Sequence, residues 1–101
     1  MTQIATTIEQ SKRILEAAGS KVKSFSDCYY PYLCDRPRPY EDAYQEKFIW
    51  ENLDLHTPAW SLSALWAIVN GMDKVFTIDT NRTLVQVFEI LVGIIVNEVR
   101  G

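Results

Sequence analysis

The sequence contains few cysteines, glycines and histidines, with two Cys, four Gly and one His in 101 residues. The glycines are isolated from one another and no glycine-rich loop precedes a Lys-Ser/Thr pair, which excludes nucleotide binding by a familiar phosphate loop. A net charge of −3 lacks the basic excess that binding to a nucleic-acid backbone requires. With 48% hydrophobic and 23% charged residues, the chain is neither disordered nor fibrous. We expect a single domain over residues 1–101.

Long apolar runs are also missing. The longest, Leu84–Val96, is shorter than the roughly 20 residues that span a bilayer and includes Gln86 and Glu89, so we expect a core helix and no membrane contact. Residues 1–6 have neither the basic nor the apolar segment of a secretion signal, and we expect the protein in the cytoplasm. In that reducing compartment the two cysteines are expected as free thiols.

Apolar spacing predicts a first helix. Ile4, Ile8, Leu15 and Ala18 fall on one stripe, and Gly19 is expected to end it. Thr6 followed by Glu9 matches a capping box, while a start at Thr2 would use Ile4 better.

Two more helices are predicted in the second half of the chain. Ser61 can cap one, with Trp60 packing on Leu65, and Asn70-Gly71 closes it because both residues tolerate the left-handed conformation. Asp79-Thr80-Asn81 is a cluster of cap formers, and the most apolar helix follows over Leu84–Val99.

The strand signals are shorter. Residues 24–59 contain all four prolines and show no helical period, although residues 40–47 could hold one helical turn. Phe48-Ile49-Trp50 indicates a strand over 47–53, and alternation predicts its partner over 74–78. The expected fold class is therefore α+β, with three main helices and a small two- or three-stranded antiparallel sheet.

The third helix has a narrow polar stripe, formed by Gln86, Glu89, Gly93 and Asn97, and about two-thirds of its circumference is apolar. Two alternatives follow. The helix forms a homodimer interface, or it is central and the aromatic-rich loop covers its other side.

Three side chains could carry chemistry: Cys28, Cys34 and His56. Structural zinc sites usually place cysteines two to four residues apart and need four ligands, whereas five residues separate these two and only one histidine exists. A Cys–His nucleophile pair, or a metal- or small-ligand-dependent enzyme built on it, stays open as the alternative function. No local catalytic signature is present, and we expect no enzymatic activity, cofactor or metal.

The most unusual local composition is a run of tyrosines with two nearby arginines. Tyrosine gives a large contact area at low entropic cost, which favours an interaction surface. The predicted members are Tyr29, Tyr30, Tyr32, Arg36, Arg38, Tyr40 and Tyr44. Two other interpretations stay open: a small core of the loop itself, with Tyr30 and Leu33 under the helices, and stacking of single-stranded nucleic acid. Nearby acids, Glu41 to Asp54, are interpreted as solubilising this segment.

Three segments carry a resemblance: residues 10–19 (QSKRILEAAG), 27–30 (DCYY) and 58–65 (PAWSLSAL). Together they resemble a group of small uncharacterised proteins encoded by gut Bacteroides, related bacteria, and their phages or other mobile elements. The group shares the order of first helix, tyrosine-bearing loop, Pro-x-Trp-Ser-Leu helix start, strand and apolar last helix, but has room for a longer hairpin than residues 72–80 provide. The resemblance implies fold and origin and no catalytic residue. We predict a non-enzymatic accessory protein that acts by protein–protein interaction.

Overall fold

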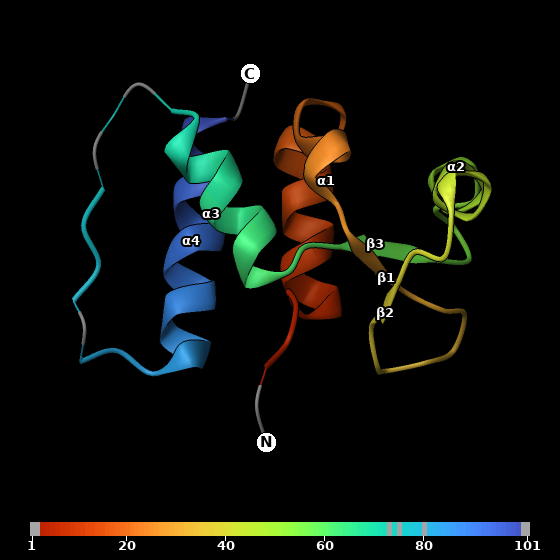
Figure 1. Cartoon of the computed structure of the whole chain (residues 1–101), viewed down its shortest axis with the longest axis horizontal. Coiled ribbons are helices and arrows are strands. Elements are labelled where there is room, and N and C mark those ends of the chain that lie inside the picture. The colour runs from red at the N-terminus through yellow and green to blue at the C-terminus, as the bar shows by residue number, and fades with distance from the viewer. Residues whose placement is uncertain (1–2, 73, 75, 80, 100–101) are drawn as a thin grey trace.

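The structure, a computed structural model, describes residues 3–72, 74, 76–79 and 81–99. Within these ranges lie four α-helices, a short 3₁₀ helix (η1, Lys23–Phe25) and one three-stranded antiparallel sheet. The α+β class is therefore confirmed, with four helices in place of three main ones. Figure 1 shows α3 and α4 on one side of α1 and the sheet on its other side, with α2 at the far end.

Helix α1 spans Ile8–Val22 and begins one residue later than the capping box expected from Thr6 and Glu9. Thr7 is the N-cap: its hydroxyl accepts from the Gln10 amide at 3.1 Å, and the Gln10 side chain accepts from the Thr7 amide at 3.0 Å. Thr6 is buried instead, where its hydroxyl accepts from the Trp60 amide at 3.1 Å. This contact with a distant segment takes Thr6 away from the cap.

The same helix continues three residues past the predicted end at Gly19. Glycine in a helix costs only about 1 kcal/mol, and burial of a valine side chain returns about 1.5–3 kcal/mol. Val22 is buried in the core, so the extension is favourable.

The sheet has the order β2-β1-β3, with β1 (Cys28–Tyr30) between β2 (Arg38–Pro39) and β3 (Thr57–Ala59). Tyr29 is opposite Arg38 and Pro58 in the two antiparallel ladders. Because side chains alternate along a strand, Tyr29 lies on one face and Cys28 and Tyr30 on the other. The face with Tyr29 packs toward α2, and the face with Cys28 and Tyr30 packs toward α1.

Both predicted strands are wrong. Residues 47–53 fall mainly in helix α2, Ala43–Glu51, whose N-cap Asp42 accepts from the Gln45 amide at 2.8 Å. The described positions 74 and 76–78 are not in a strand, and position 75 lies outside the described residues. Ile49, one of the residues that indicated a strand, is the buried residue of α2.

Helix α3 spans Leu62–Asn70 with the predicted N-cap Ser61, whose hydroxyl accepts from the Ala64 amide. Gly71 ends it by donating its amide to helix carbonyls, but at φ −82° it is right-handed, so the expected left-handed cap is wrong. Helix α4 spans Leu84–Glu98 and is capped by Thr83, not by the 79–81 cluster, of which Thr80 lies outside the described residues.

The main core lies between α1, α3 and α4, and Trp60 connects it to the sheet. Trp60 is fully buried, and its indole donates to the Val22 carbonyl at 3.0 Å. The buried side of α4 is covered by α1 and α3, and the segment containing Met72, Phe76 and Ile78 packs against the same core. Trp50, from the aromatic-rich segment, packs against this core as well.

Candidate functional site

Four aromatic rings form a continuous series from the sheet to the surface of α2. Tyr40 stacks on Tyr29 with ring centroids 5.6 Å apart, and Tyr29 meets His56 edge-on at 6.3 Å. His56 in turn contacts the Phe48 ring at 5.8 Å. The series brings together residues from β1, the segment after β2, α2 and the approach to β3.

Hydrogen bonds fix the inner end of this series. Gln45 on α2 donates to the Tyr29 hydroxyl at 3.0 Å, and a hydrogen bond of 2.9 Å joins the hydroxyls of Tyr40 and Ser26. Burial raises the pKa of the Tyr40 hydroxyl to about 12, and its bond to Ser26 opposes this only in part. Tyr40 therefore stays neutral and anchored at any physiological pH.

The outer end is exposed. Tyr44 is 87% exposed and Phe48 is 54% exposed, and their spacing of four residues places them side by side on the helix. Leu53 and Leu55, in the turn that follows α2, are also exposed. These four side chains are named the α2 patch.

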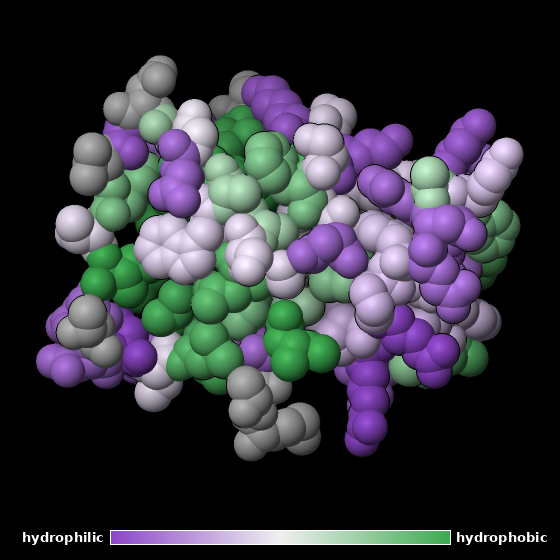
Figure 2. Space-filling view, in the orientation of Figure 1, coloured by the Kyte–Doolittle hydropathy of each residue, from purple (hydrophilic) through white to green (hydrophobic). Residues whose placement is uncertain are grey.

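Acidic side chains surround the α2 patch along the chain. Glu41 and Asp42 precede the helix, Glu51 ends it, and Asp54 lies in the following turn, all exposed. Between positions 41 and 54 the sequence has five acids and one lysine. Figure 2 shows hydrophilic surface gathered at the end of the molecule where α2 lies, with hydrophobic surface at its outer edge. The α2 patch is thus an apolar surface with an acidic margin.

The predicted surface residues divide among three places. Tyr29 and Tyr40 lie in the aromatic series, Arg38 shares the Tyr29 face of the sheet, and Tyr44 lies on the α2 patch. Tyr30 is buried on the opposite face, where its hydroxyl donates to the Thr6 carbonyl at 2.8 Å. As a surface residue Tyr30 is therefore a wrong prediction, and Tyr29 is also buried.

Tyr32 and Arg36 lie in the β1–β2 connection and are exposed. Leu33 between them is 90% exposed, so its expected packing under the helices is wrong. The Cys34 amide donates to the Pro31 carbonyl at 3.0 Å and closes a turn in which Leu33 has a φ of 57°. Left-handed backbone at this position of a turn is usually supplied by glycine or asparagine.

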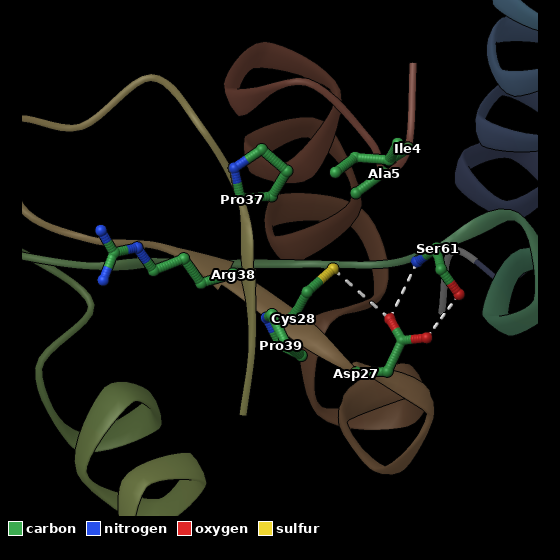
Figure 3. A pocket seen from close by; sticks show the side chains of 8 residues that line it. All are labelled: Ile4, Ala5, Asp27, Cys28, Pro37, Arg38, Pro39 and Ser61. Atoms are coloured by element: carbon green, nitrogen blue, oxygen red, sulfur yellow. Dashed lines mark hydrogen bonds between the residues drawn. The ribbon is translucent and has the colours of Figure 1, made fainter. Parts of the chain in front are cut away.

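A pocket of about 200 Å³ lies on the other face of the sheet, between Ala5 of the N-terminal segment and Pro37 (Figure 3). Its lining includes Arg38. The other polar residues of the pocket, Asp27, Cys28 and Ser61, are already committed to the fold. Asp27 accepts from the amide and the hydroxyl of Ser61, and Ser61 caps α3. Cys28 donates its thiol to Asp27, and burial raises the pKa of that thiol well above its usual range, with the Asp27 charge adding to the effect.

The three candidate catalytic or metal-binding side chains are not brought together. Cys28 and the Tyr29–His56 contact lie on opposite faces of β1. Cys34 donates to the Arg36 carbonyl. A protonated Cys28 is not a nucleophile, because the thiolate is the reactive form.

Over the part of the chain that the structure describes, no three His, Cys, Asp or Glu side chains form a group that could hold a metal ion. No helix within the same ranges is both long and apolar enough to cross a membrane.

Comparison with known protein families, curated proteins and solved structures finds no match to this chain.

The sequence did not predict that Phe48 and His56 belong to the aromatic series. Phe48 lies within the predicted strand over 47–53, and the sequence indicated His56 only as a catalytic or metal-binding candidate. The signal that could have placed Phe48 was the Asp42…Gln45 spacing of an N-cap, followed by Tyr44 and Phe48 four residues apart.

Proposed function

We propose that this protein is a non-enzymatic accessory protein that acts in the cytoplasm by binding another protein through the α2 patch. One observation carries the proposal: Tyr44, at 87% exposure, and Phe48, at 54%, stand side by side on a helix that the aromatic series holds against the sheet. Exposed aromatic side chains on a rigid support are typical of interface centres, because little entropy is lost when they are covered.

The residues that were candidates for catalysis also support a binding role. Burial and Asp27 hold the Cys28 thiol protonated, and the Cys34 thiol donates to the Arg36 carbonyl. A bacterial or mobile-element origin, taken from the resemblance in sequence, stays a prediction that belongs to this proposal.

A homodimer through α4 receives less support than binding through α2. On α4, Val85 is the one exposed large apolar side chain within the described residues, and the buried side of the helix packs on α1 and α3. A second copy of the chain is therefore kept as an outcome of the test and not as the proposed partner.

Photo-crosslinking in the host cell tests the proposal. A photoreactive phenylalanine analogue placed at Tyr44 should give a discrete adduct, and the same analogue at Val85 should give none. Adding Phe48→Ser should abolish the Tyr44 adduct. Adducts from position 85 alone, or adducts that survive Phe48→Ser, would contradict the proposal, and an adduct of twice the chain mass would identify a second copy as the partner.

A further inference from the structure

We infer that the partner of the α2 patch is a basic amphipathic helix, with an apolar stripe and Lys or Arg near both of its ends. This inference rests on the proposed function and adds the chemistry of the partner. Its basis is the arrangement of charge around Tyr44 and Phe48.

The acids lie at both ends of the apolar surface. Glu41 and Asp42 are at the start of α2, and Glu51 and Asp54 are at its end. Nine helical residues span about 14 Å at a rise of about 1.5 Å per residue. A partner helix laid along α2 would therefore bring cations to both acidic ends if its basic residues were roughly nine positions apart, with the apolar stripe between them.

The acids at the end of α2 are unfavourable for the helix itself. A helix C-terminus carries partial negative charge and is stabilised by cations, yet α2 ends on Glu51 and has no basic residue in its last turn. Lys47 approaches Glu51 only at 3.9 Å, with both side chains largely exposed. An exposed pair of this kind contributes little, so the fold gains little from Glu51, whereas a cationic partner would be attracted by Glu51 and Asp54.

The same charges disfavour other occupants. Phosphate groups of nucleic acid or of anionic lipids would be repelled by four carboxylates around the apolar surface. An uncharged apolar segment would gain no orientation from them. A helix with basic residues near both ends would be attracted to these acids, and the two pairs of opposite charges would fix its position along α2.

The probe is a synthetic 14-residue amphipathic peptide with a leucine stripe and lysines at both ends. The control peptide carries glutamates in place of the lysines. Fluorescence anisotropy should show the lysine peptide binding at least tenfold more tightly, with affinity that falls as salt is raised. Tyr44→Ser with Phe48→Ser should abolish binding. Equal affinity for the two peptides, or binding that survives these two substitutions, would overturn the inference.

Charge-reversed variants separate a binding role from a structural one. Glu51→Lys with Asp54→Lys should weaken binding of the lysine peptide about tenfold, while the melting temperature stays equal or rises. The control, Glu9→Lys with Glu16→Lys, makes the same change of net charge at two exposed positions of α1 and should leave affinity within about twofold. If the two variants lose the same affinity for the lysine peptide, net charge alone explains the effect and the inference is overturned.

The uncharged variant Glu51→Gln with Asp54→Asn should bind the lysine peptide with an affinity between those of the wild type and the charge-reversed variant.

If the adduct from position 44 forms in the host cell but the protein shows no preference for the lysine peptide over the glutamate peptide, the inferred partner chemistry is wrong and the proposed function stands. If no adduct forms at position 44, the proposed function itself fails.

Discussion

Tyr40 couples folding to alkaline pH. Its pKa is 10.0 in the unfolded chain and about 12 in the fold, chiefly through burial. Between these values the folded protein keeps a proton that the unfolded chain has lost, so the free energy of unfolding falls as pH rises. Between these two pH values we expect the free energy of unfolding to fall by about 1 kcal/mol less in Tyr40→Phe than in the wild type. This figure is discounted because Tyr40 is partly exposed to solvent.

Urea denaturation at about pH 9 and about pH 11.5 measures the difference. The lost hydrogen bond to Ser26 lowers the stability of Tyr40→Phe by a similar amount at both pH values, so the comparison isolates the titration. Parallel losses in the two proteins would show that Tyr40 does not titrate as described.

Leu33 occupies left-handed backbone, which costs a leucine roughly 1–2 kcal/mol and costs asparagine less. Its side chain is 90% exposed and contributes little packing in return. Leu33→Asn should therefore raise the free energy of unfolding by about 0.5–1 kcal/mol. Thermal melts against Tyr32→Asn, at the neighbouring exposed position, provide the control. A gain in both variants, or in neither, would contradict the strain at Leu33.

At the scale of the element, α2 depends on its N-cap. Asp42 accepts from the Gln45 amide at 2.8 Å, and loss of an N-cap costs about 1 kcal/mol. Asp42→Ala should raise the hydrogen-exchange rates of the α2 amides severalfold, whereas Asp42→Asn keeps a capping oxygen and should leave these rates near those of the wild type. Exchange rates that rise equally in the two variants would contradict the role of Asp42 as the cap.

Helix α2, of which the sequence indicated only one possible turn over 40–47, differs from the other helices in how it buries apolar residues. α3 and α4 carry long apolar stripes whose period is visible in the sequence. α2 buries only Ile49 deeply and leaves Tyr44 and Phe48 exposed, so its apolar pattern does not mark one face. The β-forming residues Phe48-Ile49-Trp50 then dominated the interpretation, although Asp42 and the spacing of four indicated a helix.

The sheet could not be predicted for a related reason. Its strands have only two or three residues, and β2 and β3 each contain a proline, which weakens the strand signal. Their pairing is set by contacts far apart in the chain, such as Cys28 opposite Ala59. Of the tyrosines in the predicted interaction surface, Tyr29 and Tyr40 stack on each other and Tyr44 is exposed on α2.

At the scale of the whole molecule, α4 has one buried side and one side open to solvent. Ile95 is fully buried among the core residues of α4, and Val85 is 56% exposed. Ile95→Asp places an unpaired carboxylate in the core, which costs several kcal/mol and should abolish the folded protein. Val85→Asp should stay within about 0.5 kcal/mol of the wild type by urea denaturation. A similar fall in the free energy of unfolding in the two variants would contradict the packing of α4.

The proposed binding through the α2 end, and not through the α4 side, is best tested by an amide NMR shift map recorded as the lysine-ended amphipathic peptide is added. We expect the shifted amides to cluster between positions 41 and 56, with smaller shifts at Tyr29 and Tyr40, whose rings belong to the aromatic series that includes Phe48. Shifts that cluster on α4 around Val85, or that spread evenly over the chain, would contradict it.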